Sequence, residues 1–324
     1  MMERLDHFMA RANAAYYATR DPFADFTTAP ELSQVFGEIL GLWAVIVWQS
    51  MGCPDPVILA EAGPGRGTLM VDALRAINRA APDFARALRL HLVENSPRLR
   101  AVQAARLPAA TWHDRIEQLP PGPYILLANE FLDALPIRQF IRRSDGWTER
   151  FVVDGAFVEL PAALPGRMAH EGDVVEICEP ALSLMTALGN MLRTHGGAAL
   201  FLDYGPADSG AGDSLQALRD GEPADPLSAS GTADLTAHVD FAAIAAAARS
   251  FGVSTHGPVT QGKFLTRLGL MPRTTALART QPPQKAAVLM DTAQRLTEPD
   301  RMGTLFKALA ICHPGLPAPP GFES

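Results

Sequence analysis

Residues 57–67 read VILAEAGPGRG, a short apolar run followed by a glycine-rich turn. The apolar run predicts a buried strand, and residues 68–80 after the turn predict a helix. Glycine lets the backbone approach a ligand closely, and the N-terminus of a helix attracts negative charge. The stretch therefore predicts a strand, a ligand-binding turn and a helix. Thr68 stands where the dinucleotide fingerprint has its third glycine, and the absence of a Gly-Lys-Ser/Thr ending excludes a P-loop.

The alternation of strand and helix continues along the chain. Residues 88–93 (LRLHLV) and 124–128 (YILLA) predict two further strands, with a helix over 97–106 between them. A helix over 182–194 leads to an apolar strand at 198–203, and an alanine-rich helix follows Phe241. Alternating strands and helices are typical of a parallel sheet with helices on its faces. We therefore predict an α/β fold with a Rossmann-like sheet.

Acidic residues and glycines at the ends of the first two strands form the candidate cofactor site. The acidic-x-Gly-x-Gly-x-Gly spacing of residues 61–67 resembles motif I of Rossmann-like S-adenosylmethionine (SAM) methyltransferases. Glu94 ends the second strand, where a carboxylate can accept both ribose hydroxyls, and Glu61 can face the ammonium group of SAM. A purely structural turn and an NAD site are the alternatives. The predicted set is Glu61, Gly63, Pro64, Gly65, Gly67, Glu94 and Asn95.

Candidate catalytic residues follow the third strand, in the segment 129–136 (NEFLDALP). Ligands of open α/β sheets bind beyond the carboxyl ends of the strands, so Asn129, Glu130 and Asp133 are expected to face the cleft. Paired carboxylates match the planar, cationic guanidinium of arginine. Glu130 and Asp133 would be neighbours if the first turn after the strand is helical. The alternative is that both acids stabilise a helix N-terminus.

His238 is a further catalytic candidate, in the segment 234–241 (DLTAHVDF). It follows a glycine-, aspartate- and proline-rich stretch from Gly205 to Gly231, which predicts a long loop. Long loops in compact domains are often functional. The alternative is that His238 lies on the surface and Asp240 caps the next helix. The three Cys are scattered without metal-type spacing, so we predict no metal site.

Four regions are predicted along the chain. Residues 1–52 form an N-terminal helical region with a loop that covers the cofactor, and residues 53–136 and 190–270 form the Rossmann-like domain. Residues 137–189 form an inserted antiparallel or cap region, because Asp145-Gly146 and Asp154-Gly155 are hairpin turn signals between strand-like runs. Residues 271–324 are expected to be a helical extension and tail.

Composition excludes some classes of function. The chain has 28 Lys and Arg against 35 Asp and Glu, a net charge of −7, which argues against binding of nucleic acid because phosphate recognition needs a basic face. Three scattered Cys indicate a reducing compartment without a disulfide framework. The most apolar run, 39–48, is about half a membrane span, so no transmembrane segment is predicted. The N-terminus matches neither a signal peptide nor a transit peptide.

These segments together resemble one known family, the MidA-like SAM-dependent methyltransferases. The resemblance covers Tyr16 to Leu270. It rests on residues 25–38 (DFTTAPELSQVFGE), 61–69, 129–136, 234–241, 261–265 (QGKFL) and 268–269. One departure is Ala24, where the family usually has glycine. The resemblance implies that the loop with Asp25, Thr28 and Ser33 folds over the cofactor cleft. It also implies that Gly63, Gly65 and Glu94 bind SAM and that Asn129 and Glu130 lie near the methyl group.

The resemblance also implies an activity. Mitochondrial members of the family are assembly factors that dimethylate an arginine of a core subunit of respiratory complex I. We therefore predict a SAM-dependent methyltransferase acting on a protein arginine, in the cytoplasm of a bacterium or the mitochondrial matrix of a eukaryote. The alternatives are a small-molecule O- or N-methyltransferase, a SAM-binding assembly chaperone without turnover, and an NAD oxidoreductase. The sequence predicts no oligomeric state.

Overall fold

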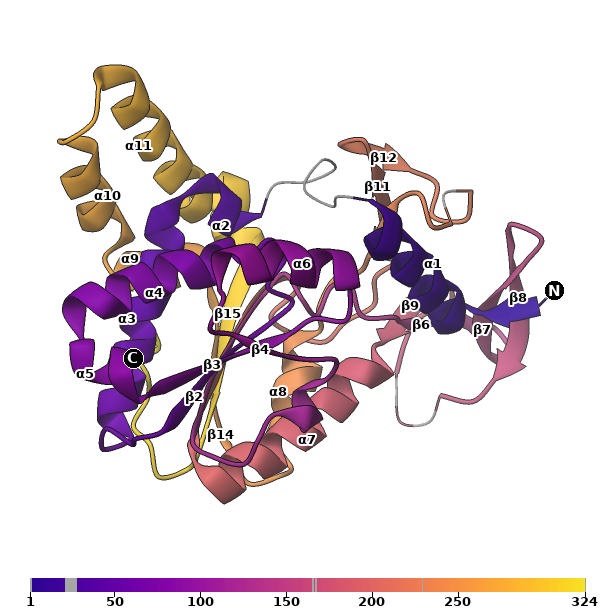
Figure 1. The fold of residues 1–324 in the computed structure, drawn as a ribbon. Coiled ribbons are helices and arrows are strands. Elements are labelled where there is room, and N and C mark those ends of the chain that lie inside the picture. The colour runs from indigo at the N-terminus through magenta and orange to yellow at the C-terminus, as the bar shows by residue number, and fades with distance from the viewer. Residues whose placement is uncertain (1, 21–27, 165, 167, 229, 324) are drawn as a thin grey trace.

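The computed structural model describes residues 2–20, 28–164, 166, 168–228 and 230–323, and its centre is a seven-stranded sheet (Figure 1). The strand order is β4-β3-β2-β5-β10-β15-β14. Neighbouring strands from β4 to β10 are parallel, whereas β15 is antiparallel to both β10 and β14. The strand bounds are β2 Val57–Ala62, β3 Leu88–Val93, β4 Thr111–His113, β5 Tyr124–Asn129, β10 Gly197–Tyr204, β14 Ser254–Thr260 and β15 Phe306–Cys312.

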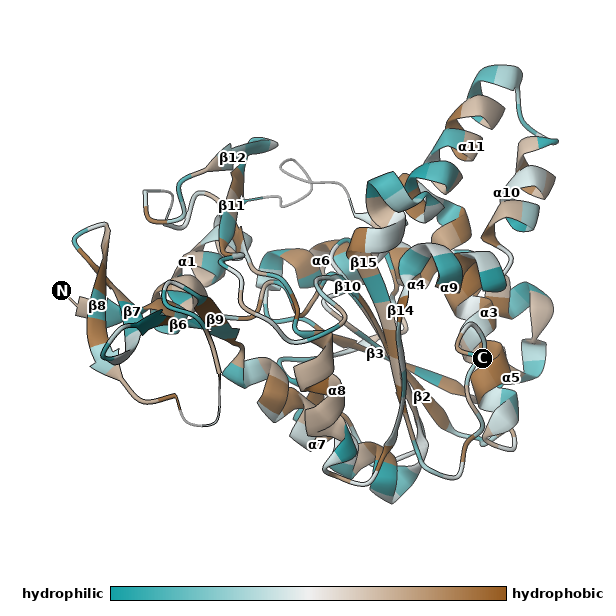
Figure 2. Cartoon of the chain, turned by 180° about the vertical axis from the view of Figure 1, so that it is seen from behind, coloured by the Kyte–Doolittle hydropathy of each residue, from teal (hydrophilic) through white to brown (hydrophobic). Residues whose placement is uncertain are grey.

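Helices cover both faces of this sheet because successive strand residues point to opposite sides. Leu59 of β2 packs in a core with α3 and α4, and its neighbour Ala60 packs in a second core with α7 and α8. Figure 2 shows the hydrophobic colour along the central strands. The helix bounds are α1 Leu5–Thr19, α2 Ala29–Leu32, α3 Gln34–Ser50, α4 Thr68–Ala80, α5 Pro82–Ala87, α6 Pro97–Arg106, α7 Glu179–His195, α8 Phe241–Arg249, α9 Gln261–Arg267, α10 Leu270–Ala278 and α11 Pro283–Thr297, with shorter turns η2 Ile116–Gln118 and η3 Pro299–Gly303.

Helices α3 and α4 pack unusually closely through two glycines. A Cβ on Gly37 would lie 2.7 Å from the Cβ of Asp72, and a Cβ on Gly41 would lie 2.6 Å from the carbonyl oxygen of Ala73. Any larger side chain would force the helices apart, which costs free energy in a packed core. This contact sets the position of α4, the helix that follows the glycine-rich turn.

A second, antiparallel sheet lies between β5 and α7 along the chain. Its order is β1-β7-β6-β9. Strands β1 and β6 share one edge of β7, and β8 pairs with the opposite edge. Strand β1 comes from the N-terminus, so the first residues of the chain join the inserted segment, as Figure 1 shows. The bounds are β1 Met2–Arg4, β6 Arg138–Arg143, β7 Gly146–Val153, β8 Ala156–Ala162 and β9 Val174–Ile177.

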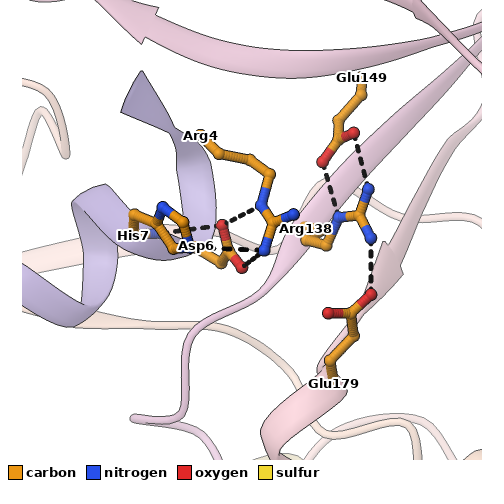
Figure 3. Close-up of polar contacts among 6 residues, drawn as sticks. All are labelled: Arg4, Asp6, His7, Arg138, Glu149 and Glu179. Atoms are coloured by element: carbon orange, nitrogen blue, oxygen red, sulfur yellow. Dashed lines mark hydrogen bonds and ion pairs between the residues drawn. The ribbon is translucent and has the colours of Figure 1, made fainter. Parts of the chain in front are cut away.

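Ion pairs connect strands within this sheet and join the sheet to α1 and α7 (Figure 3). Arg138 of β6 forms a two-bond pair with Glu149 of β7, at 2.7 and 2.8 Å, and also contacts Glu179 at the start of α7 at 2.6 Å. Arg4 pairs with Asp6 at the start of α1 at 2.6 Å. Paired guanidinium and carboxylate groups have matching geometry, so these contacts set the orientation of the elements. The Arg4–Asp6 pair joins β1 to the start of α1, and the Arg138–Glu179 pair joins β6 to α7.

Several predicted elements are confirmed and two are corrected. The α/β class and the mostly parallel sheet are confirmed. The predicted loop from Gly205 to Gly231 contains two short strands, which form a three-stranded sheet in the order β12-β11-β13. Alternation there is too short to stand out from a run of turn-forming residues. The bounds are β11 Gln216–Arg219, β12 Glu222–Ala224 and β13 Asp234–Thr236.

The expectation of a helical extension and tail over 271–324 omitted one strand. Strand β15 lies in this range, is fully buried and separates β10 from β14 in the central sheet. Its residues run apolar from Phe306 to Cys312 apart from Lys307, but such a short run does not by itself distinguish a strand from a buried helix. Across the described ranges, no helix combines the length and the apolar character needed to span a bilayer.

Candidate active site

A cavity of about 830 Å³ lies at the carboxyl ends of β2, β3 and β5. Its volume is in the range of small-molecule and cofactor sites. Residues from the turns after these strands line it, together with residues of α1 and α7. Because parallel strands all end at the same edge of a sheet, side chains far apart in sequence meet here. The lining includes Asn13, Tyr17, Thr28, Glu61, Gly63, Pro64, Gly65, Glu94, Asn95, Asn129, Glu130, Pro180 and Ser183.

The turn after β2 requires its glycines. Gly63 and Gly65 have φ values of 65° and 54°, in the left-handed region that favours glycine, and both line the cavity. A Cβ on Gly63 would lie 2.9 Å from the ring of Phe131. Gly67 differs from the prediction, because it precedes the first residue of α4 with φ 75° and is absent from the cavity lining. Its role in the fold is to begin the helix.

Two carboxylates at strand ends face this cavity. Glu61 is 3% exposed, its Oε2 has no hydrogen-bond partner among the described residues, and burial raises its pKa to about 8. Glu94 accepts hydrogen bonds from the backbone N–H of Ser96 at 2.8 Å and from Nε2 of Gln103 at 3.3 Å. Burial raises the pKa of Glu94 as well. Both groups are placed to receive donors from a bound molecule.

Asn129 and Glu130 lie side by side where β5 ends. The Glu130 carboxylate accepts a hydrogen bond from Nδ2 of Asn129 at 3.0 Å and from the backbone N–H of Ala29 at 3.3 Å. Burial, reinforced by the charge of Asp133, raises the pKa of Glu130 to about 8. The Oδ1 of Asn129 is buried and has no partner in the described part of the chain. A carboxylate and an amide oxygen therefore stand ready to accept N–H groups.

Asp133, which was expected to face the cleft, does not line the cavity, and neither does His238, the other catalytic candidate. The segment after β5 is an irregular turn, and Asp133 is buried there without lining the cavity. It is 6% exposed, its Oδ1 has no hydrogen-bond partner among the described residues, and burial raises its pKa to about 6. His238 is exposed and borders a separate cavity of about 110 Å³. The three-residue spacing between Glu130 and Asp133 did not show which of the two side chains would line the cavity.

The loop before α3 meets the prediction in part. Thr28 lines the cavity and precedes α2. Ser33 caps α3 by accepting a hydrogen bond from the backbone N–H of Val35 at 3.2 Å, and it does not line the cavity. Its expected contact with the cofactor is therefore replaced by a structural role. Asp25, the third residue predicted from this loop, lies outside the described residues.

The sequence interpretation missed residues of α1 and β10. Tyr17 lines the cavity and donates a hydrogen bond to Asp234 at 2.8 Å, and Asn13 holds the backbone of β13 with bonds of 2.8 and 3.0 Å. No local signal links α1 to the cleft, because α1 reaches it through contacts distant in sequence. Asp203 near the end of β10 was missed too, although the same strand-end rule that selects Glu94 applies to it.

Comparison with known proteins gives a family. Residues 39–259 match a family model described as "Putative S-adenosyl-L-methionine-dependent methyltransferase". The mitochondrial protein arginine methyltransferase NDUFAF7 homolog of Drosophila melanogaster is 34% identical over 353 residues, which cover 95% of this chain and 80% of that protein. NDUFAF7 of Xenopus tropicalis is 35% identical over 91% of this chain and 78% of its own. The chain belongs to the MidA-like SAM-dependent methyltransferases.

Solved structures agree with this assignment to the MidA-like family. A Burkholderia thailandensis protein crystallised with S-adenosyl-homocysteine (SAH) is 26% identical and superimposes with a TM-score of 0.82, over 99% of this chain and 90% of that chain. A native crystal structure from the same organism gives 28% identity and a TM-score of 0.83 over 100% and 90% of the two chains. The chain is a SAM-dependent methyltransferase, and the NAD oxidoreductase alternative is excluded.

The residues of this MidA-like chain fit SAM. The unpartnered Oε2 of Glu61 is a buried acceptor that a cationic amino group would satisfy. Glu94 offers a carboxylate at the next strand end, the position suited to ribose hydroxyls. The missing Cβ atoms of Gly63 and Gly65 leave the backbone open to close approach. The chemistry of these groups matches the amino group and the ribose of the cofactor.

Raised carboxyl pKa values predict that the ligand-free protein loses stability as pH rises. Glu61 and Glu130 have pKa values of about 8, against an ordinary value of 4.5, so the folded chain binds their protons more tightly than the unfolded chain. The stability that these protons contribute is complete below pH 4.5 and is lost as pH rises through 8, at about 1.4 kcal/mol per pH unit for each group. Urea unfolding between pH 5 and 8.5 measures it. The Glu61→Gln/Glu130→Gln double variant is the control, and a decline as steep as that of the wild type would contradict the prediction.

Proposed function

We propose that this chain transfers a methyl group from SAM to an arginine nitrogen of a protein, a core subunit of respiratory complex I. The observation that carries the proposal is Glu130 beside Asn129 at the end of β5, inside the cofactor-sized cavity. The curated relatives are named as protein arginine methyltransferases, which supports a protein substrate. Their names place them in mitochondria, and we propose the matrix, or the cytoplasm of a bacterium, as the site of action.

The charge of the cavity supports a cationic substrate. Six carboxyl side chains line it, and Arg115 is the one basic residue among the described lining residues. Glu31 and Asp114 pair with Arg66 and Arg100 outside the lining. Glu61, Glu94 and Glu130 have no ion-pair partner within the described ranges, so a bound cation would stabilise their ionised forms. The acids of the lining are Glu31, Glu61, Glu94, Asp114, Glu117 and Glu130.

On the cofactor side, we propose that Glu61 accepts the ammonium group and Glu94 the ribose hydroxyls. Gly63, Pro64 and Gly65 line the same wall and provide close backbone contact. When bound, SAM supplies an electrophilic methyl group on a positively charged sulfur. The chain's task is to place the nucleophile in line with this methyl group and to exclude water, because orientation provides much of the rate enhancement in such a displacement.

On the acceptor side, we propose that Glu130 and Asn129 orient the guanidinium. Its planar N–H groups donate to the Glu130 carboxylate and to the unpartnered Oδ1 of Asn129. As the nitrogen–methyl bond forms and the sulfur–methyl bond breaks, the nitrogen must lose one proton. Glu130 accepts it: the bound guanidinium keeps this carboxylate ionised before the transfer, and burial raises its pKa enough to hold the proton afterwards.

Labelled SAM tests the function directly. The purified protein and SAM carrying an isotopic methyl group are incubated with purified core subunits of complex I, and with a lysate of cells that lack the enzyme. Mass spectrometry is expected to find the label on an arginine side chain of a core subunit. A lysate from cells that retain the enzyme is the control, because its sites are already methylated.

Each other outcome selects an alternative. Label in the small-molecule fraction overturns the proposal in favour of a small-molecule O- or N-methyltransferase. Stoichiometric binding of a core subunit without transfer of label favours an assembly chaperone. Label on a protein residue other than arginine would support methyl transfer to a protein and overturn arginine as the acceptor.

A further inference from the structure

Asp203 lies near the end of β10, beside the turn that carries Glu130. One of its carboxylate oxygens, Oδ2, accepts backbone N–H bonds from Phe131 at 3.1 Å, Leu132 at 2.8 Å and Asp133 at 3.3 Å. The other oxygen accepts the backbone N–H of Tyr204 at 2.9 Å. The residue is 1% exposed and has no ion pair with any described Lys or Arg. Burial, reinforced by the charges of Asp133 and Glu130, raises the pKa of Asp203, whereas the backbone N–H groups of Tyr204 and Leu132 favour its ionised form.

Within the turn that Asp203 holds, the backbone of Glu130 is strained. Glu130 has φ 49°, in the left-handed region, which is unfavourable for a residue with a side chain. Its own N–H donates to the carbonyl of Leu202 at 2.8 Å. Leu202 pairs with Asn129 across the parallel strands, so β10 sets the position of the backbone at Glu130. Asp203 then holds the backbone of the next three residues through its hydrogen bonds. Such strain persists where the surroundings hold it.

We propose that Asp203 is the positioning residue that holds Glu130 in its strained conformation and directs its carboxylate into the active-site cavity. The inference rests on the proposed function, in which Glu130 orients the acceptor and takes its proton. A neutral isostere cannot replace Asp203, because both oxygens accept N–H groups and an asparagine would turn an NH₂ group toward one set of donors. The amide and the backbone N–H groups would then repel each other.

Kinetics of methyl transfer provide the first test. Asp203→Asn is expected to lower kcat at least 100-fold while KM for SAM and the calorimetric Kd for SAH change less than threefold. A role in general stability would not lower kcat while leaving KM for SAM and the Kd for SAH nearly unchanged. The control is Asp72→Asn, which removes a buried carboxylate on α4 that pairs with Arg75. We expect its kcat to stay within twofold of wild type, and equal losses in both variants would overturn the proposal.

A second test needs no acceptor. Glycine tolerates a positive φ and alanine does not, so Glu130→Gly is expected to have a higher urea midpoint than Glu130→Ala. In the Asp203→Asn background the turn is released, and the difference is expected to shrink. An unchanged difference there, or none in the wild-type background, overturns the role of Asp203. If Asp203→Asn does not fold by itself, adding Glu130→Gly is expected to recover folded protein, and failure to do so counts against the proposal.

The two tests separate this inference from the proposed function. Full turnover by Glu130→Gln would remove the proposed role of Glu130, whereas the comparison of Glu130→Gly with Glu130→Ala would still show whether Asp203 holds the turn. An inactive Glu130→Gln together with a fully active Asp203→Asn would retain the proposed function and reject the positioning role.

Discussion

Glu130→Gln is expected to reduce methyl transfer about 1,000-fold, within the range for loss of a general base, while the Kd for SAH changes less than threefold. Glutamine keeps the size of the side chain and can still accept the N–H of Ala29 and the amide of Asn129. It cannot take the proton that the acceptor nitrogen loses. Initial rates with labelled SAM and the identified acceptor, beside calorimetry with SAH, provide the measurement.

The matched control for this variant is Glu38→Gln. Glu38 is 5% exposed, pairs with Arg273 at 2.7 Å and is not part of the cavity lining. It therefore reports what loss of a buried carboxylate does to the enzyme in general. Turnover close to wild type is expected for Glu38→Gln. A Glu130→Gln enzyme that works at the wild-type rate would remove Glu130 from the chemistry.

Glu61→Gln is expected to weaken SAH binding about 100-fold, equivalent to about 2.7 kcal/mol. Removing the charge of one partner in a buried pair has effects of this size. Glu61 is almost completely buried and its Oε2 has no partner within the described residues, so a bound ammonium group would be its counterion. Titration calorimetry of the variant and the wild type with SAH measures the difference.

A truncated ligand identifies which end of the cofactor Glu61 contacts. 5′-Methylthioadenosine lacks the amino acid part, so Glu61→Gln is expected to leave its affinity within threefold of wild type. Glu94→Gln is the matched variant, and it is expected to weaken both ligands because the ribose is common to them. Equal losses of both ligands in Glu61→Gln would contradict contact with the ammonium group.

The same contact predicts release of a proton on binding. With a pKa of about 8, Glu61 is mainly protonated in the free enzyme at pH 7, and an ammonium partner stabilises the ionised form. Calorimetry in two buffers with different enthalpies of ionisation is expected to show proton release for the wild type and less for Glu61→Gln. Identical proton release in both proteins would assign the proton to another group.

The candidate site was predictable where its signal is local. A short apolar strand, a glycine-rich turn and a helix follow one another within residues 57–80, and the acids at the strand ends are adjacent to the strands that place them. Glu61, Glu94 and Glu130 therefore line the cavity as expected. The Rossmann-like class followed from the same alternation, because parallel strands that end at one edge bring their turns together.

Other assignments failed where the direction of a side chain mattered. Asp133 is three residues from Glu130, yet the turn is not helical and Asp133 is buried outside the cavity lining. His238 follows the segment that carries β11 and β12, and the fold leaves it on the surface beside another cavity. The dihedral angles of a turn depend on the bonds that hold it, here those from Asp203, and these bonds come from a strand about 70 residues later.

By itself, the sequence determined the α/β class, the cofactor turn and three of the carboxylates around the cavity, because each depends on residues adjacent along the chain. The tertiary structure alone decided three further features: α1 forms part of the cavity wall, β15 completes the sheet, and Asp203 holds the turn of Glu130. The physical reason is that these contacts join segments distant in sequence. Strand pairing and burial select them from many possible partners, and no periodicity within either segment records the choice.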